Sequence, residues 1–318
     1  MSAWMSRRTF LKGTVAGAAL AAGAPKAFAE EGKPVVPLAK RVVILGLDGI
    51  RPDGLAAART PNIDRLFRRG VFSNTTLVEQ STGTWTQPSW TTLFSGGGQA
   101  QHGVTGNSWT NASNTEHAEG YRDAEGYVPS VFSVLKDNGV NTAFYWNWSQ
   151  LIKSYNPNAF TDTNDVAEAK YEENFNRTAD FLIKHKDERS LVFLYDVHTD
   201  NTGHRKGWMS DAYLAAIGES DAAFGRLLSR LAGAGLLADT HFLFLSDHGG
   251  HDTTHGLRQP TDEIVPWGIV GPGIRRNVRL PKDATLNNTV NNSSILLRLF
   301  GVEQPNHWVG KVPDGIFA

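Results

Sequence analysis

Hydrophobic runs alternate along the chain with amphipathic segments. Continuous apolar runs of strand length occur at residues 41–47, 142–146, 191–195, 241–246 and 265–270. Segments with helical periodicity, or with helix start and stop signals, occur at 63–69, 131–138, 166–186, 210–231 and 294–300. Uninterrupted apolar strands are typical of a sheet that is covered on both faces. The alternation therefore predicts an α/β fold, with a central, largely parallel sheet sandwiched between helices in a single domain over residues 30–318.

Polar residues follow three of the predicted strands. Asp48 follows the first strand, the segment 196–204 follows the third, and Asp247-His248 follows the fourth. The carboxyl ends of parallel strands meet at one edge of a sheet, and ligands bind there. We therefore expect these segments to bring carboxylates and imidazoles together. A single Asp before Gly more often forms a turn, so the prediction rests on the three segments jointly.

These segments and the loop after them contain six candidate metal ligands of two chemical types: Asp48, Asp200, His204, Asp247, His248 and His255. The chain has no cysteine, and imidazole with carboxylate suits Zn²⁺ or a similar first-row ion in a catalytic site. Six ligands are enough for two divalent ions. Two ions roughly 4 Å apart can hold both the attacking and the leaving oxygen of an in-line displacement. For Asp200 and His204, a capping carboxylate and a surface histidine are the alternative.

A threonine precedes a predicted helix that starts at Pro88. Thr86 is by default the N-cap of this helix. The same position suits a nucleophile, because a hydroxyl at a helix N-terminus lies near backbone N–H groups that attract a phosphoryl oxygen. Ser89 is an alternative nucleophile. Asn107, in a Gly-Asn pair, is by default a turn residue.

Six short motifs occur in the order seen in nucleotide pyrophosphatase/phosphodiesterases, the type I phosphodiesterases of the alkaline phosphatase superfamily. They are Leu47-Asp48-Gly49, Thr86-Gln87-Pro88-Ser89-Trp90, His102-Gly103-Val104, Asp200 to His204, Ser246-Asp247-His248-Gly249 and His255-Gly256. The chain resembles this family from about Val42 to Gly273. The resemblance implies an alkaline-phosphatase-like fold and a metal-dependent phosphodiester or pyrophosphate hydrolase with two divalent ions, for which Zn²⁺ is expected.

The resemblance also implies roles for individual residues. One ion would be bound by Asp200, His204 and His255, and the other by Asp48, Asp247, His248 and the nucleophile Thr86. Asn107 would donate to a nonbridging phosphoryl oxygen. The match at His255 is partial, and His251 is the alternative. His198 and His102 are expected either to pack against other side chains or to support the metal ligands without contacting an ion.

The implied reaction is a small-molecule phosphoester hydrolysis through a covalent phosphothreonine, with a nucleotide as one possible substrate class. A phosphomonoesterase, in which Arg205 and Lys206 would contact the extra phosphate charge, and a phosphonate hydrolase are alternatives. Residues 79–118 contain no Lys or Arg, which favours a diester. A sulfatase is disfavoured, because no Cys is present and Trp90 stands where that family has Arg. A non-catalytic metal-binding relative is the remaining alternative.

Tryptophans are frequent in sequence near these motifs: Trp85, Trp90, Trp109, Trp146 and Trp148. Tryptophan usually lies in the core. One or two of these five are expected to line a pocket for an aromatic group such as a nucleobase.

The first 29 residues differ from the rest of the chain. Arg7-Arg8 precedes a short apolar stretch of small residues at 14–24, and Ala27-Phe28-Ala29 fits a cleavage site. The pattern predicts a twin-arginine signal peptide, export by the twin-arginine machinery to the periplasm or medium, and no membrane anchor. A frayed basic terminus is the alternative. Residues 30–318 contain 27 basic and 32 acidic residues, so no nucleic-acid-coating surface is expected.

Overall fold

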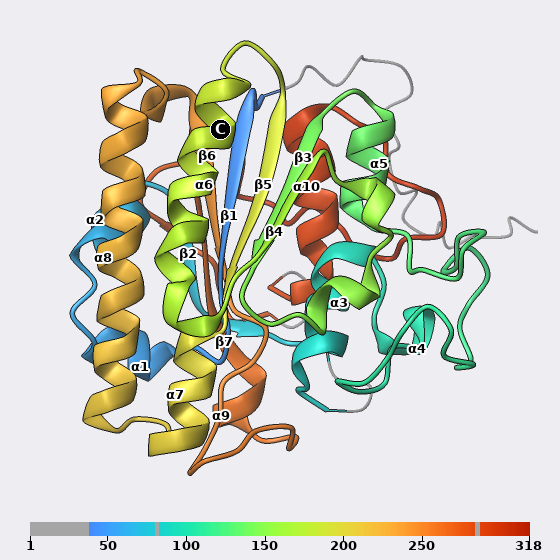
Figure 1. Cartoon of the computed structure of the whole chain (residues 1–318), viewed down its shortest axis with the longest axis horizontal. Helices are drawn as coiled ribbons and strands as arrows, with labels where there is room; N and C mark the ends of the chain where they lie inside the picture. Colours follow the sequence, from blue (N-terminus) through green and yellow to red (C-terminus); the bar gives the residue numbers. More distant parts are fainter. Residues whose placement is uncertain (1–37, 80–82, 284–286) are drawn as a thin grey trace, which may run out of the picture. The chain divides into compact units, whose positions relative to one another are not determined.

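The computed structural model describes residues 38–79, 83–283 and 287–318, which belong to one compact unit, Val35–Ala318. Within these ranges the chain forms an eight-stranded sheet with helices on both faces (Figure 1). The predicted twin-arginine signal, residues 1–29, lies outside the described residues. The predicted fold class is confirmed.

The strands are ordered β4-β3-β5-β1-β6-β7-β2-β8 across the sheet. β7 runs antiparallel to its neighbours β6 and β2, and the other pairings are parallel. The strands are β1 (Arg41–Leu47), β2 (Val71–Leu77), β3 (Asn141–Trp146), β4 (Asp162–Asp165), β5 (Ser190–Asp196), β6 (Thr240–Leu245), β7 (Ile264–Val270) and β8 (Val278–Arg279). The central strands β5, β1 and β6 are therefore parallel, and their carboxyl ends lie at one edge.

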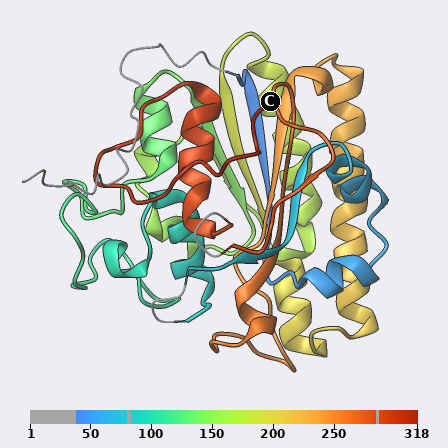
Figure 2. The same cartoon turned by 180° about the vertical axis from the view of Figure 1, so that it is seen from behind.

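Helices cover the two faces in separate groups (Figures 1 and 2). One group includes α6 and α8, and the other includes α3, α5 and α10. The α-helices of the described residues are α1 (Pro52–Ala57), α2 (Pro61–Phe67), α3 (Thr86–Ser95), α4 (Gln99–His102), α5 (Val131–Asp137), α6 (Tyr171–Lys184), α7 (His198–Lys206), α8 (Asp211–Gly233), α9 (Pro260–Glu263) and α10 (Asn292–Phe300).

Strand β1 shows why the apolar runs are continuous. Side chains alternate between the faces of a strand. Val42 and Ile44 pack in the core beneath α3 and α10, whereas Val43 and Leu45 pack in the core beneath α6 and α8. All seven residues of β1 are buried. Both faces of the sheet therefore require apolar side chains, as expected for a sheet covered on both sides.

Several predicted boundaries are wrong where the chain is polar. The predicted helix 166–186 begins as α6 only at Tyr171, after a 3₁₀ turn at Glu168–Lys170. The preceding strand β4 was not predicted. It has the sequence Asp-Thr-Asn-Asp and lies half exposed at the edge of the sheet, where an apolar pattern is not required. The polar helix α7 was not predicted for the same reason.

The start of α3 also differs from the prediction. Thr86 is the first residue of the helix, and the N-cap is Trp85, which makes no side-chain cap hydrogen bond. Helix α3 packs closely on the sheet at Gly46, where an added Cβ would lie 2.6 Å from the ring of Trp90. A glycine at this strand position is therefore required for the close approach. The contact brings the N-terminus of α3 to the carboxyl end of β1.

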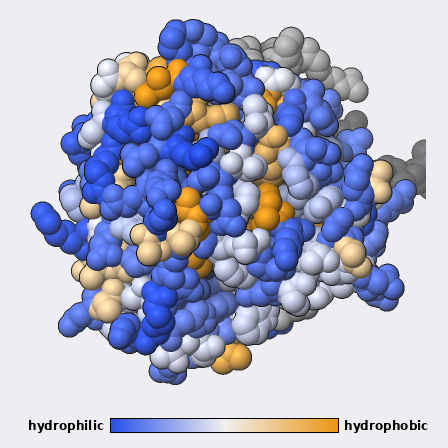
Figure 3. Space-filling model, viewed as in Figure 1, coloured by the Kyte–Doolittle hydropathy of each residue, from blue (hydrophilic) through white to orange (hydrophobic). Residues whose placement is uncertain are grey.

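The face of the molecule in Figure 3 is mostly hydrophilic, with small separate hydrophobic spots. Within the described ranges, none of the helices combines the length and the apolar composition that a membrane span requires.

Candidate active site

Six carboxylate and imidazole residues gather at the carboxyl edge of the sheet in two groups of three. We call Asp48, Asp247 and His248 the buried trio, and Asp200, His204 and His255 the edge trio. In each trio the candidate ligand atoms lie within 4.8 Å of one another. The buried trio follows strands β1 and β6, which pair with each other. The edge trio comes from α7, after β5, and from the loop between β6 and β7.

The ring of His248 is oriented by the backbone. Its Nδ1 lies 2.7 Å from the carbonyl oxygen of Gly249, which can only accept, so Nδ1 carries the proton. Burial lowers the pKa of His248 well below its usual value, which keeps the ring neutral. The Nε2 lone pair therefore faces Asp48 Oδ1 and Asp247 Oδ2, each 3.3 Å away. Three electron-pair donors thus converge on one point.

One oxygen of each carboxylate in the buried trio has no hydrogen-bond partner. Among the described residues, nothing donates a hydrogen bond to the buried atoms Asp48 Oδ1 and Asp247 Oδ2, and the same holds for Asp200 Oδ1 in the edge trio. Burial, and then the repulsion among these carboxylates, raises the pKa values of Asp48 and Asp247 well above their usual range. Unpaired buried carboxylates that face imidazole lone pairs fit a cation site.

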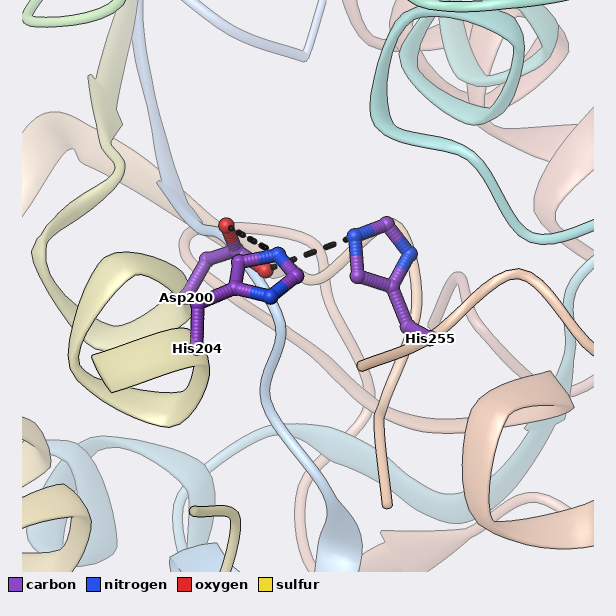
Figure 4. Close-up of side chains that lie close together, drawn as sticks. All are labelled: Asp200, His204 and His255. Carbon is purple, nitrogen blue, oxygen red and sulfur yellow. Dashed lines mark ion pairs between the residues drawn. The ribbon is translucent and has the colours of Figure 1, made fainter. Parts of the chain in front are cut away.

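The edge trio repeats this arrangement nearer to solvent (Figure 4). Asp200 and His204 lie four residues apart on α7, so both point from one face of the helix. The Nδ1 atoms of His204 and His255 lie 2.9 and 2.8 Å from the carbonyl oxygens of Thr253 and Thr84. Their Nε2 atoms face the Asp200 oxygens, at 3.5 and 3.8 Å. Backbone hydrogen bonds of this kind fix the tautomer of a metal-ligating histidine.

The two trios adjoin through stacked imidazoles. The rings of His248 and His255 lie 3.7 Å apart between centroids, at an interplanar angle of 13°. The trios therefore form one continuous polar centre.

Thr86 lies against the buried trio. Its Oγ1 is 3.2 Å from His248 Nε2, and the residue is 4% exposed. The hydroxyl of Thr84, in contrast, donates to the carbonyl oxygen of Leu257 at 3.3 Å. Thr86 thus has its hydroxyl directed at the converging donor atoms, at the first position of α3.

Asn107 is held beside Thr86. Its Oδ1 accepts a hydrogen bond from the backbone N–H of Gln87, at 2.9 Å. An N–H can only donate, so the acceptor is the side-chain oxygen of Asn107. Among the described residues, Nδ2 donates to no protein atom. A free amide donor therefore lies next to the candidate nucleophile.

A known protein family matches most of the chain. The family model for type I phosphodiesterase / nucleotide pyrophosphatase matches residues 42–268. The chain belongs to this family. The members of this family are metal-dependent phosphodiesterases and pyrophosphatases.

Curated relatives match at modest identity. Bis(5'-adenosyl)-triphosphatase ENPP4 of Bos taurus is 24% identical over 66% of this chain and 47% of its own length. Ectonucleotide pyrophosphatase/phosphodiesterase family member 3 of Rattus norvegicus is 26% identical over 76% of this chain and 29% of its own. The chain thus spans less than half the length of either relative.

Solved structures share the fold. Murine ectonucleotide pyrophosphatase / phosphodiesterase 5 superposes with a TM-score of 0.71 at 18% identity, covering 87% of this chain and all of that one. A putative sulfatase from Bacteroides thetaiotaomicron gives a TM-score of 0.69 at 16% identity, covering 86% of this chain and 73% of that one. The fold alone therefore does not select the ester that is cleaved.

Other predicted candidates lie outside both trios of this family member. His251 binds Asp262 through Nδ1, at 2.8 Å, rather than facing Asp200. His198 lies between Glu168 and Glu219, and the buried His102 binds the hydroxyl of Thr92. These histidines have local protein partners.

The guanidinium of Arg205, considered as a phosphate ligand, is bound to another group. It makes two hydrogen bonds to the carboxylate of Glu168, at 2.7 and 3.1 Å. Burial raises the pKa of Glu168, but this pairing outweighs that effect and lowers the pKa below its usual value. Lys206 is exposed at the last position of α7.

Tyr195 was not predicted as part of the site. Its hydroxyl donates to Asp48 Oδ2, which leaves Oδ1 facing His248. Tyr195 lies inside the apolar run of β5, and an aromatic residue in such a run is normally predicted to pack in the core. Its position directly before the polar segment that follows β5 could have indicated that it lies near the site.

The tryptophans divide by exposure. Trp90, Trp109 and Trp146 are buried in the core, whereas Trp85 is 39% exposed. The ring of Trp85 lies edge-on to His255, with 5.4 Å between centroids. Trp85 is therefore the exposed aromatic surface next to the edge trio.

A separate cavity of about 570 Å³ lies between α1, α2 and the β2–β8 edge, lined by residues such as Leu55, Phe67 and Phe72. None of the six trio residues lines it. We therefore place the candidate active site at the trios.

Proposed function

We propose that this chain is a two-metal phosphodiester or pyrophosphate hydrolase that acts through a covalent phosphothreonine at Thr86. The observation that carries the proposal is the convergence of Thr86 Oγ1, His248 Nε2 and two unpartnered carboxylate oxygens at one buried point. Family membership supplies the class of ester.

The six trio residues fit two divalent cations. Asp48, Asp247 and His248, with Thr86, would hold one, and Asp200, His204 and His255 the other. Ligands of imidazole and carboxylate without thiolate favour Zn²⁺. When bound, such ions stabilise the anionic form of a coordinated hydroxyl and the negative charge of the transferring phosphoryl group.

Thr86 is the group that attacks phosphorus. The hydroxyl loses its proton to solvent, and a bond forms between Oγ1 and phosphorus while the bond to the leaving oxygen breaks. Water later cleaves the phosphothreonine and restores the hydroxyl. Thr86 Oγ1 lies 3.2 Å from His248 Nε2, so the hydroxyl is already directed at the point where the ligand atoms converge. The position of Thr86 at the start of α3 places the positive end of the helix dipole near the phosphoryl oxygens.

Asn107 supplies a neutral donor for a nonbridging oxygen. Its Nδ2 is unused by the protein within the described residues, and Oδ1 is fixed by Gln87. A preorganised donor of this type contributes on the order of 3 kcal/mol to transition-state stabilisation.

The charges around the site favour a diester over a monoester. A monoester carries one more negative charge and needs additional cations. Arg205 is paired with Glu168, and exposed Trp85 offers apolar surface to a second ester substituent. A relative of the same fold, an inactive variant of murine ectonucleotide pyrophosphatase / phosphodiesterase 5, was solved with AMP. We propose nucleotide-type diesters as the substrate class.

The test is to trap the intermediate. Metal-loaded protein is mixed with bis-p-nitrophenyl phosphate, quenched in acid and analysed by peptide mass spectrometry. We expect one p-nitrophenolate to be released and a p-nitrophenyl phosphoryl group to remain on the peptide that contains Thr86, with no label after chelation. Steady turnover with no label on Thr86, or with label on Ser89, would contradict the covalent assignment.

We also propose export to the periplasm or medium by the twin-arginine machinery. The support is the pattern of Arg7-Arg8, the short apolar stretch and Ala27-Phe28-Ala29. Replacing both arginines by lysine should leave the unprocessed chain in the cytoplasm. Unchanged processing and export of that variant would rule out this route.

A further inference from the structure

The residue after Thr86 is a buried, fully hydrogen-bonded glutamine. Gln87 is 0% exposed. Its Oε1 accepts from the backbone N–H of Trp109 at 3.1 Å, and its Nε2 donates to the carbonyl oxygen of Trp109 and to Ser154 Oγ, both at 2.8 Å. A side chain at the first turn of α3 thus binds both backbone polar groups of a residue 22 positions away.

This bonding allows one orientation of the amide. The backbone N–H of Trp109 can only donate and its carbonyl can only accept, so the Gln87 oxygen and nitrogen cannot exchange places. Gln150 supports the same contact, because its Nε2 donates to the Trp109 carbonyl at 3.0 Å. The loop at Trp109 is therefore fixed to α3 by buried hydrogen bonds, which are costly to break.

The same glutamine also contacts Asn107 through its backbone. The Gln87 N–H donates to Asn107 Oδ1 at 2.9 Å, and Asn107 lies two residues before Trp109. One residue thus holds the loop at two points, through its side chain at Trp109 and through its main chain at Asn107. Both contacts act on the segment that carries the free Nδ2.

We propose that Gln87 is a positioning residue that fixes the Asn107 amide beside Thr86, an inference that rests on the proposed function. A donor stabilises a phosphoryl oxygen only when it is held at hydrogen-bond distance before the reaction begins. Without Gln87, the loop retains Asn107 but loses its buried anchor at Trp109. Replacing Gln87 is therefore expected to lower kcat, because the Asn107 amide is no longer held in position.

A glutamine that only stabilises the core would behave differently. Its removal would lower the melting temperature but would not reduce the rate per folded molecule through Asn107. A double-mutant cycle separates these cases, because a residue that acts through Asn107 has no effect on the rate once Asn107 is absent.

The experiment compares wild type, Gln87→Met, Asn107→Ala and the double variant with bis-p-nitrophenyl phosphate at saturating metal. Gln87→Met keeps the side-chain length and removes the amide. We expect Asn107→Ala to lower kcat by roughly 10²-fold and Gln87→Met by roughly tenfold or more, with KM within about threefold. In the Asn107→Ala background, Gln87→Met should lower kcat by less than about twofold.

The matched control is Thr91→Val, on the same helix. The Thr91 hydroxyl is buried and donates to the Gln87 carbonyl within α3, without reaching the loop. It should lower the melting temperature with kcat unchanged. Should Gln87→Met not fold, Gln87→Glu takes its place, since it keeps the acceptor for the Trp109 N–H and loses the donor.

An equal fold-loss from Gln87→Met in both backgrounds would overturn the inference while leaving the proposed function intact. An Asn107→Ala variant with wild-type kcat would overturn it as well, because there would be no donor to position. A metal-loaded wild type that hydrolyses no phosphodiester would overturn the proposed function and the inference together.

Discussion

The two trios contain the same ligand types but differ in the part of the fold that holds them. The buried trio follows two paired central strands, and its members are 0% exposed. The edge trio comes from a polar helix and a loop, and the His204 side chain is 39% exposed. The sheet therefore fixes the first group, whereas the second lies where water and substrate can enter.

The pKa values of the carboxyl groups also differ between the two trios. Burial raises the pKa values of Asp48 and Asp247 well above their usual range, and raises that of Asp200 to about 7. Without a cation, the buried carboxylates are therefore the more costly to ionise. We infer that the buried trio depends more strongly on its ion, and that the edge trio exchanges its ion more readily.

The largest effect is expected at Thr86, which contacts the buried trio. Thr86→Ala removes the attacking oxygen but leaves all six carboxylate and imidazole ligands in place. Activity on bis-p-nitrophenyl phosphate should fall by roughly 10³-fold or more with metal content nearly unchanged. Steady-state kinetics and elemental analysis of the same sample measure both quantities.

Ser89→Ala is the control for Thr86. Ser89 lies one helical turn further along α3 and is equally buried, at 4% exposed. It should retain activity within about threefold. The reverse pattern, with Thr86→Ala active and Ser89→Ala inactive, would move the nucleophile to Ser89.

Ligand substitutions test the difference between the trios directly. Asp247→Asn in the buried trio and His204→Ala in the edge trio should each remove roughly one ion per chain and abolish turnover. Because the side chains of the buried trio are 0% exposed, Asp247→Asn should not regain its ion at high Zn²⁺ concentration. His204→Ala should regain it in part, since water can replace an exposed ligand. Equal recovery in both variants would remove the distinction.

The difference in rate between a diester and a monoester is expected to be a smaller effect, and it tests whether Arg205 on α7 contacts the substrate. We expect kcat/KM for bis-p-nitrophenyl phosphate to exceed that for p-nitrophenyl phosphate by about tenfold, because residues 79–118 contain no Lys or Arg and the Arg205 guanidinium is paired with Glu168. Arg205→Ala should change both values by less than about threefold, since its guanidinium is bound to Glu168. A monoester advantage that disappears in Arg205→Ala would identify a phosphatase whose α7 contacts phosphate.

The contrast between the trios also explains how far the sequence could predict the site. Asp48, Asp247 and His248 follow continuous apolar strands, and that pattern directly indicates the ends of a parallel sheet. Asp200 and His204 lie on α7, whose nine residues carry no apolar face, so their shared helix face could not be predicted.

Contacts made across the fold were beyond prediction for a further reason. The hydrogen bond from Tyr195 to Asp48 joins residues 147 positions apart, and Gln87 binds Trp109 through a loop that has no periodicity. Only the packing of α3 on β1 and the pairing of β5 with β1 bring these groups together. The chain leaves β6 at the edge of the sheet that carries the two trios and enters β7 at the same edge, so β7 runs antiparallel to β6. No local sequence pattern indicates this reversal.

The smallest predicted effect concerns the stability of chelated protein, and it isolates Asp200. Burial, and then the charge of Glu168, raises the pKa of Asp200 in the folded chain from 3.8 to about 7. The folded state therefore keeps a proton that the unfolded state releases. The stabilisation is complete below the unfolded pKa and is lost as pH rises toward 7. Asn does not titrate, so comparing wild type with Asp200→Asn cancels the contributions of titrating groups that do not interact with Asp200. Between about pH 5 and pH 7, chelated wild type should lose on the order of 2 kcal/mol of unfolding free energy relative to the variant, measured by urea titration.

With Zn²⁺ saturating, the trend should reverse, because the cation favours the carboxylate. A pH-independent difference in chelated protein would mean that the Asp200 carboxylate is solvated or paired, and that the two trios do not differ in the way their burial indicates.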